Sequence, residues 1–224
     1  MSIKTSFKDL GEIRYKEAWD YQEELFKELL DAKRDDVKSN NYLLFCEHLP
    51  VFTLGKSGSE ENLLMNQDFL QKQGIEFFKI NRGGDITFHG PGQIVGYPIL
   101  DLEQFGMGVK QYIHALEEVI IRTLSDYNIK SERLEDSTGV WLDTDTASVR
   151  KICAIGVKAS RYVSMHGFAF NINTNLNYYT YINPCGITDK SVTSLHEELG
   201  RFVELEEVKT KIKFYFKEVF GMEL

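Results

Sequence analysis

Lys151 and Cys185 are the two residues whose types together support nucleophilic acyl chemistry. Cys185 lies in residues 183–186 (NPCG), a turn sequence whose proline and glycine expose the thiol to whatever fills the adjacent cleft. Lys151 opens an apolar, alternating run, and a nearby ammonium favours the thiolate, which is the nucleophilic form of cysteine. The alternative is a small buried thiol, because free cysteine is among the most buried residue types.

A second group of residues typical of a ligand site runs from Arg82 to Gln93 (RGGDITFHGPGQ). Its glycines let the backbone approach a ligand closely, and Arg82 is suited to hold an anion with two parallel hydrogen bonds. Thr87 and His89 share a face if this segment is extended. A hairpin turn built on the Gly-Gly pair is the alternative, but such a turn has no need for clustered Arg, Thr, His and Gln. The pattern therefore predicts a binding loop.

The segment that begins at Lys151 predicts a hairpin that would position its lysine. Strict alternation puts Ile152, Ala154, Gly156 and Lys158 on one face of a strand, and Cys153, Ile155, Val157 and Ala159 on the other. A break follows at residues 160–162, and residues 166–173 read as the second strand.

The remaining periodicities predict strands alternating with amphipathic helices. Pro98, inside one apolar run, indicates an edge strand or a bulge because proline cannot donate to a sheet. The predicted strands are 5–15, 42–48, 77–80, 94–102 and 137–142, and the predicted helices are 15–33, 65–73, 108–128 and 204–220.

Composition favours one globular domain outside the membrane. The chain has 224 residues, of which 42% are hydrophobic and 27% charged, and its net charge is −8. An acidic chain argues against a general binder of nucleic acid or of anionic membranes. Three cysteines do not form a disulfide framework, and there is neither a long apolar run nor a signal-peptide core at the start. We therefore expect a soluble, cytoplasmic protein.

Three motifs, taken together, resemble the LipB family of lipoyl(octanoyl) transferases. They are residues 82–93, residues 151–156 (KICAIG) with 166–169 (HGFA), and residues 183–186. The resemblance covers nearly the whole chain, with the motifs in order. It implies an α/β fold with a mixed sheet flanked by helices, like the catalytic domain of lipoate–protein and biotin–protein ligases, and a single catalytic domain over residues 1–224.

The resemblance also implies an activity, its partners and its site. Such an enzyme transfers an octanoyl or lipoyl group from acyl carrier protein to one lysine of a lipoyl domain (E2 subunits and the glycine cleavage H protein), the first step of endogenous protein lipoylation. Cys185 would carry the acyl thioester and Lys151 would lower the pKa of that thiol, with no cofactor and no metal. The implied acyl-pocket residues are Arg82, Gly83, Gly84, Asp85, Ile86, Thr87, Phe88, His89, Ala154, Ile155, Gly156, Gly167, Phe168 and Ala169.

Three further expectations come from the residues themselves. Backbone N–H groups of Gly83, Gly84 or Gly167 are candidates to hold a tetrahedral oxyanion. The side chains expected along an acyl tunnel are Phe88, Ile155, Phe168 and Phe170. Docking of acidic partner proteins calls for a basic rim, for which the candidates are Lys79, Arg82, Arg150, Lys151, Lys158 and Arg161.

Two other functions remain open at this level. A ligase that activates lipoate with ATP needs a nucleotide phosphate site and has no need of Cys185. The sequence Gly55-Lys56-Ser57 resembles the end of a phosphate-binding loop, but Pro50 stands where the first glycine of that motif belongs. A non-catalytic acyl-binding or carrier-docking module would keep the pocket but has no use for a lysine and a cysteine together.

Overall fold

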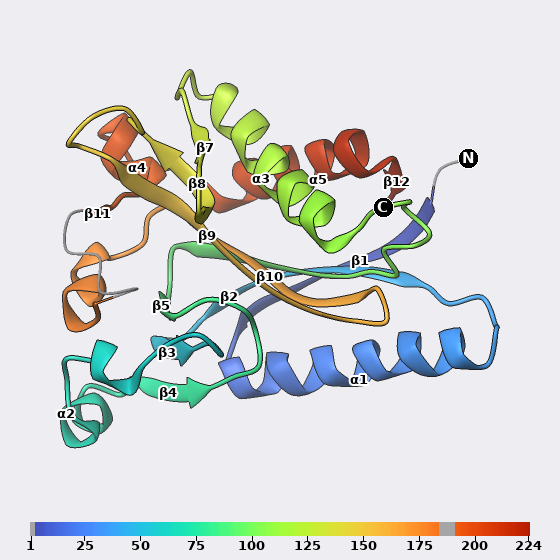
Figure 1. Ribbon diagram of the computed structural model, residues 1–224. Helices are drawn as coiled ribbons and strands as arrows, with labels where there is room; N and C mark the ends of the chain where they lie inside the picture. Colours follow the sequence, from blue (N-terminus) through green and yellow to red (C-terminus); the bar gives the residue numbers. More distant parts are fainter. Residues whose placement is uncertain (1–2, 184–190) are drawn as a thin grey trace.

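The computed structural model describes residues 3–183 and 191–224. In this part of the chain a nine-stranded mixed sheet has the order β12-β1-β2-β6-β10-β9-β8-β7, with β11 beside β9 (Figure 1). β1 runs parallel to both β2 and β12, whereas the strands from β2 to β7 pair antiparallel. The strands are β1 (Ile3–Ile13), β2 (Asn41–His48), β6 (Gln93–Ile99), β7 (Glu132–Leu134), β8 (Ser137–Leu142), β9 (Arg150–Ser160), β10 (Val163–Asn171), β11 (Ser191–Val192) and β12 (Met222–Glu223).

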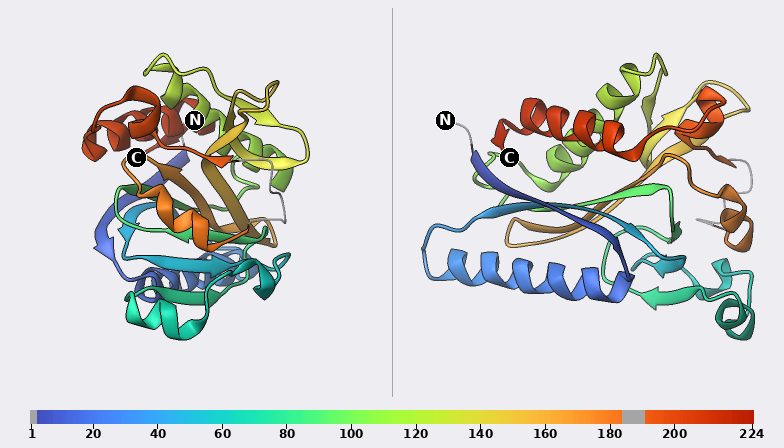
Figure 2. Two further views of the ribbon diagram at one scale, coloured as in Figure 1. Left: turned by 90° about the vertical axis from the view of Figure 1, so that its left-hand side faces the viewer. Right: turned by 180° about the vertical axis from the view of Figure 1, so that it is seen from behind.

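Helices cover both faces of this sheet, as the amphipathic stripes predicted. α1 (Tyr15–Arg34) lies on one face, and α3 (Val109–Ser125) and α5 (Leu205–Phe220) lie on the other, as the opposite views of Figure 2 also show. Each helix buries one stripe, including Leu29 of α1, Leu116 of α3 and Phe216 of α5. Full burial of one such side chain contributes about 1.5–3 kcal/mol, so packing against the sheet holds the helices in place. None of the described helices is long and apolar enough to cross a membrane.

A small three-stranded sheet adjoins the end of α1 that begins at Tyr15. It consists of β4 (Glu76–Lys79), β3 (Val51–Leu54) and β5 (Ile86–His89) in that order. The motif that begins at Arg82 connects β4 to β5, so this sheet positions the predicted binding loop. The short helical elements are η1 (Glu60–Asn62), α2 (Gln67–Lys72), η2 (Leu176–Tyr181) and α4 (Leu195–Leu199).

The predicted hairpin from Lys151 is present as β9 and β10. The turn between them contains Arg161 and Tyr162, both with positive φ (48° and 62°), which matches the break predicted at residues 160–162. Such a pair of left-handed residues gives a tight turn the twist that two antiparallel strands require.

A bulge at the start of β9 changes the predicted alternation. Val140 pairs with Cys153 but Trp141 pairs with Lys151, so Ile152 is an extra residue. As a result Ile152 and Cys153 are buried in the same core, under α3 and α5. Lys151 is thereby placed on the same side of β9 as Ala154, whereas strict alternation would oppose them.

The expectation that Pro98 marks an edge or a bulge is wrong. β6 lies between β2 and β10, and Pro98 pairs with Leu43 of β2. Its ring faces β10 at Gly167, where a Cβ would lie 2.6 Å from the proline Cδ. Pairing with β10 stops at Gly96 and Phe168 and resumes beyond β6 at Asp101 and Val163, so the missing N–H falls in a gap of the ladder. The Pro98 carbonyl still accepts from the Ser164 hydroxyl at 2.9 Å.

Candidate active site

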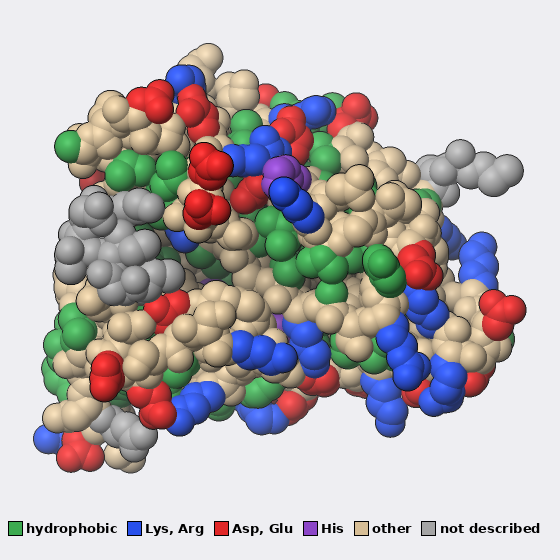
Figure 3. Space-filling view, in the orientation of Figure 1, with side chains coloured by type: hydrophobic (Ala, Val, Ile, Leu, Met, Phe, Trp, Pro, Cys, Tyr) green, Lys and Arg blue, Asp and Glu red, His purple; other side chains and the backbone are tan. Residues whose placement is uncertain are grey.

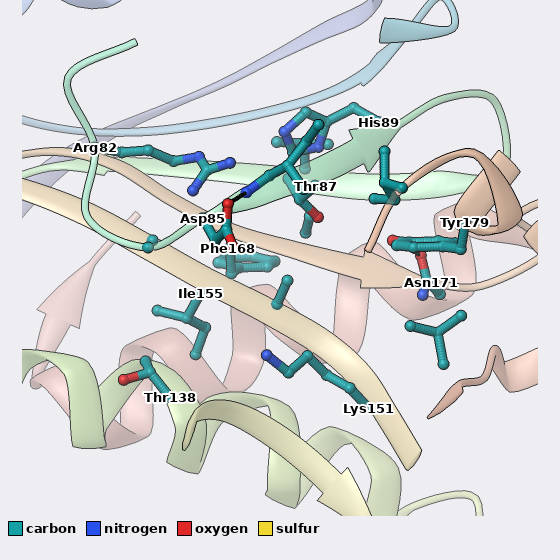
Figure 4. A pocket seen from close by; sticks show the side chains of 18 of the residues that line it. Arg82, Asp85, Thr87, His89, Thr138, Lys151, Ile155, Phe168, Asn171 and Tyr179 are labelled. Carbon is teal, nitrogen blue, oxygen red and sulfur yellow. Dashed lines mark hydrogen bonds between the residues drawn. The ribbon is translucent and has the colours of Figure 1, made fainter. Parts of the chain in front are cut away.

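A pocket of about 730 Å³ lies beside β9 and β10, with the β4–β5 loop on its other side (Figure 4). That volume is typical of a small-molecule site. Its wall contains most of the side chains that the sequence predicted for an acyl pocket. These are Arg82, Gly84, Asp85, Ile86, Thr87, His89, Ala154, Ile155, Gly156, Gly167, Phe168 and Ala169.

Three of the expected residues lie outside the pocket wall, and each has another role. Gly83 donates its N–H to the Val157 carbonyl at 2.9 Å, so it ties the loop to β9 and is not open to an oxyanion. Phe88 packs face to face on Tyr178 with ring centroids 4.4 Å apart, on the far side of β5. Phe170 is fully buried in the core beneath α3 and α5.

Lys151 reaches the pocket from β9, and Figure 4 shows its ammonium pointing inward. The Nζ atom lies 4.5 Å from the centre of the Trp141 ring, a cation–π contact that stabilises the charged amine. A Cβ on Gly139 would lie within 3.5 Å of the Lys151 side chain. The buried Glu117 carboxylate accepts the Gly139 N–H at 3.1 Å, so α3 fixes the strand along which this lysine extends.

The predicted binding loop is held by a chain of hydrogen bonds from Arg82 to β10. Arg82 is 8% exposed and donates to the carbonyl and hydroxyl oxygens of Thr53, at 2.8 and 3.0 Å. The Thr53 hydroxyl donates to Nε2 of His89 at 3.3 Å, and His89 Nδ1 donates to Gln93. The Gln93 amide then donates to Asn171 Oδ1 at 2.9 Å. The polar residues of the motif therefore form one buried network.

Three buried histidines around this network are neutral. Burial lowers the pKa of His48 to about 4 and that of His166 to about 3, and it brings the pKa of His89 well below its usual range. The nearby Arg82 charge further lowers the pKa of His89 and His166. His48 donates from Nδ1 to the Ile13 carbonyl at 2.9 Å and accepts from the Tyr97 hydroxyl at 2.7 Å. A ring nitrogen can accept a hydrogen bond only when the imidazole is neutral, so this acceptor role requires a neutral ring.

We expect these histidines to make the protein unstable in mild acid. An unfolded histidine titrates near 6.5, so the unfolded state takes up protons first as the pH falls below that value. The stability that the neutral histidines contribute is therefore fully present above pH 6.5, and it decreases as the pH falls from 6.5 to about 4. Between pH 7 and pH 5, His48 and His166 should each lower the free energy of unfolding by about 2 kcal/mol. Urea unfolding at pH 7 and pH 5 measures this, and equal unfolding free energies at both pH values would contradict it.

Cys185 lies outside the described residues, and the other two cysteines are unsuited to attack. Cys46 and Cys153 are both fully buried. Burial raises the pKa of each thiol far above its usual range, so both are protonated at neutral pH. Asn183 and Ser191, the described residues on either side of the segment that contains Cys185, both line the pocket.

Several pocket residues were not among those predicted from the sequence. Tyr15 comes from the start of α1, Trp141 from β8, Asn171 from the end of β10 and Tyr179 from η2. Their only sequence signal was aromatic or polar character at the end of a predicted element, which core residues share. The pocket thus combines apolar and polar side chains with the Lys151 ammonium, an arrangement suited to an apolar chain with a reactive head group.

Comparison with known proteins identifies the family. A family model for the lipoyl protein ligase A/B catalytic domain matches residues 14–217. The octanoyltransferase of Parabacteroides distasonis is 58% identical over 216 residues, which cover 96% of this chain and 98% of that protein. The octanoyltransferase of Christiangramia forsetii is 53% identical over 231 residues, covering 100% and 99%.

Solved structures confirm the expected fold. A bi-partite lipoate protein ligase from Thermoplasma acidophilum has a TM-score of 0.72 at 14% identity, over 99% of this chain and 86% of that one. A biotin protein ligase from Aquifex aeolicus has a TM-score of 0.57 at 15% identity, over 96% and 70%. At these identities the likeness is one of fold. With the sequence relatives, it follows that the chain belongs to the lipoyl protein ligase A/B catalytic-domain family and, within it, to the octanoyltransferases of the LipB type.

Proposed function

We propose that this octanoyltransferase moves the acyl group from acyl carrier protein to one lysine of a lipoyl domain, through a thioester on Cys185. The supporting observation is the position of Lys151. Its ammonium lies in the wall of an acyl-sized pocket that Asn183 and Ser191 also line, on either side of the segment that contains the thiol. The whole of residues 1–224 then acts as one catalytic domain in the cytoplasm, without cofactor, nucleic acid or membrane.

In the first half-reaction, the Cys185 thiolate attacks the carbonyl carbon of the donor thioester. A new C–S bond forms to the enzyme, and the carrier's sulfur leaves with the electron pair of the old C–S bond and takes a proton from the Lys151 ammonium, which becomes a neutral amine. An ordinary thiol near pKa 8.5 is only a few per cent ionised at pH 7. Lowering that pKa to about 7 takes roughly 2 kcal/mol of differential stabilisation, which one close ammonium in a partly dry cleft can supply.

In the second half-reaction, the amine of the acceptor lysine attacks the enzyme thioester. An amide forms, Cys185 leaves as thiolate, and Lys151 takes the proton that the amine loses. The first step exchanges one thioester for another, and the amide formed in the second makes the overall transfer favourable. Gly83 is bonded to β9, and Gly84 lies against Arg82, at the end of the pocket away from Lys151, so neither of these loop glycines is placed to hold the oxyanion.

Mass spectrometry after incubation with octanoyl carrier protein tests the proposal. A mass increase of one octanoyl group on Cys185, formed without ATP and lost on addition of lipoyl domain, is the expected result. A ligase would give no adduct until ATP and a free acid are supplied. A carrier-docking module would bind the carrier protein and retain an unmodified thiol under both conditions.

The expected basic rim is largely neutralised in the structure. Arg82 is buried and cannot belong to an exposed rim. Lys79 pairs with Glu60 and Arg150 with Glu198, with closest contacts of 2.6 and 2.7 Å, and Lys158 lies 3.5 Å from Glu23. On the face shown in Figure 3, basic and acidic side chains are interspersed.

We still expect kcat/KM for the carrier protein to fall as salt rises, because a predominantly acidic enzyme and an acidic carrier require local basic contacts. The decrease between low salt and about 0.5 M salt should be roughly tenfold. A small thioester donor of octanoate is the control, and its kcat/KM should change little. If the two donors show the same salt profile, docking does not rely on charge.

A further inference from the structure

The inner end of the pocket carries a buried cation, Arg82, with the Asp85 carboxylate close enough to favour its charge. The Arg82 side chain donates hydrogen bonds to the neutral oxygens of Thr53 and Gly83. A guanidinium has five N–H groups, and these contacts do not use all of them. Buried charges are normally paired or bind a ligand, because leaving water without compensation is costly.

Two neighbouring pocket residues also have unused hydrogen-bonding capacity. His166 is 2% exposed and donates from Nε2 to Asn81 Oδ1 at 2.8 Å, while its Nδ1 acceptor is buried without a partner. The Tyr15 hydroxyl makes no hydrogen bond within the described residues, although its ring stacks on His89. Unsatisfied polar groups are rare in protein interiors, so the buried His166 Nδ1, beside the spare N–H groups of Arg82 and the Tyr15 hydroxyl, points to a bound polar group.

This polar end lies away from Lys151, along β9. The Arg82 side chain crosses β9 at Gly156. A Cβ atom added to this glycine would lie 3.0 Å from Arg82 Cδ and 3.3 Å from Arg82 Nη1. Lys151 and Gly156 are five residues apart, and because Ile152 is the bulge residue the backbone between them spans four regular steps, about 13 Å along the strand. In Figure 4 the guanidinium of Arg82 and the ammonium of Lys151 enter from opposite sides, with Phe168 between them in the view.

An octanoyl chain that reacts beside Lys151 would not fill this distance. Seven carbon–carbon bonds of about 1.5 Å in a zigzag extend roughly 9 Å. The methyl end therefore stops among the apolar side chains of Ile155 and Phe168, short of Arg82. A longer saturated chain would place its methyl end against the Arg82 guanidinium, the Tyr15 hydroxyl and the His166 imidazole. These polar groups would then lose water without gaining a hydrogen-bond partner.

We propose that the inner end of the pocket, formed by Arg82, Tyr15 and His166, is a hydrogen-bonding subsite. It excludes longer saturated acyl chains by their polarity and accepts a longer chain whose far end carries a hydroxyl group. This inference rests on the proposed function, since it places the reacting carbonyl at Lys151. Selection by this polar subsite differs from a limit on chain length alone. A chain that ends in a hydroxyl group would be admitted, although a saturated chain of the same length, ending in a methyl group, would not.

Isosteric pairs of small acyl thioesters distinguish the two kinds of limit. The short pair is heptanoyl and ω-hydroxyhexanoyl, and the long pair is undecanoyl and ω-hydroxydecanoyl, with equal numbers of heavy atoms within each pair. In the short pair we expect the hydroxyl chain to have a kcat/KM about tenfold lower, because its hydroxyl is buried among apolar atoms. In the long pair the hydroxyl chain should be better by about tenfold, because it meets the polar end. A similar loss on adding the hydroxyl in both pairs would overturn the proposal.

Binding of the corresponding free acids, measured by calorimetry, separates this inference from the proposed function. If octanoyl thioester is not transferred at all, the proposed function fails, but the order of affinities within each pair still reports on the inner end. Arg82→Met should abolish the advantage of the long hydroxyl chain, and Arg82→Lys should retain part of it. Arg201→Met, at an exposed arginine, is the control. It should leave the ratio of affinities within the short pair and within the long pair unchanged. Arg82→Met with an unaltered ratio would also contradict the proposal.

Discussion

A Cys185→Ser protein is expected to lose octanoyl transfer by roughly four orders of magnitude or more and to form no acyl adduct. A serine hydroxyl is far less ionised than a thiol at neutral pH, and an ammonium neighbour cannot compensate for that difference. Transfer from octanoyl carrier protein to a lipoyl domain gives the rate, and intact-protein mass spectrometry gives the adduct. Turnover by the serine variant at the parent rate would exclude Cys185 as the nucleophile.

The other two cysteines provide matched controls. Because Cys46 and Cys153 are buried among apolar side chains, alanine is the appropriate replacement, since a serine would bury a hydroxyl. Cys46→Ala and Cys153→Ala should each retain most of the activity and the full adduct. Loss of the adduct in either variant while the protein remains folded would move the search for the nucleophile to that site.

Substitutions of Lys151 are expected to separate its two proposed roles. Lys151→Arg keeps a positive charge, so Cys185 should still be acylated, although more slowly. Arginine cannot accept a proton from the acceptor amine, so transfer to the lipoyl domain should fall by about 10²–10⁴-fold. Lys151→Ala should impair both steps and raise the thiol pKa. Single-turnover acylation and deacylation, with alkylation by iodoacetamide against pH, measure these effects.

The choice of control for Lys151 follows from the structure. Arg150 is its neighbour in sequence, but its Nε and Nη2 atoms both donate to the Glu198 carboxylate at 2.7 Å, so its loss would disturb β9 and α4. This ion pair makes Arg150→Ala a poor control. The exposed Lys56 is better, and Lys56→Ala should change neither step. If the alkylation pKa is the same in Lys151→Ala as in the parent, Lys151 is not the partner of the thiolate, and the buried, neutral His89 and His166 are unsuited to replace it.

Local sequence patterns predicted the elements and many residues of the pocket wall. The stripes of α1, α3 and α5 follow from burying one helical face against a sheet, and the β9–β10 hairpin follows from alternation interrupted at Arg161 and Tyr162. Residues 82–93 are singled out because glycine, arginine, threonine and histidine rarely cluster without a ligand to contact, whereas the pocket positions at 154–156 and 167–169 come from the resemblance to the LipB family.

What the patterns did not predict depends on partners distant in sequence. Pro98 is tolerated in a central strand because Gly167 of β10 faces it. Arg82 is buried because Thr53 of β3 satisfies part of its guanidinium, which a charge count cannot reveal. The bulge at Ile152 arises from pairing with β8. Each depends on tertiary contacts that override local preference.

The bulge at Ile152 has a consequence for natural and engineered variants of this chain. Because the bulge shifts the side-chain alternation by one position, Lys151 faces the pocket only while Ile152 remains the extra residue. Regular pairing of Ile152 with Trp141 would turn Lys151 away from the pocket while leaving every residue of the site in the chain, whereas deleting Ile152 would keep Lys151 on the pocket side. Homologues should therefore be compared by strand register in this stretch, and loop engineering should leave the pairing of β8 with β9 unchanged.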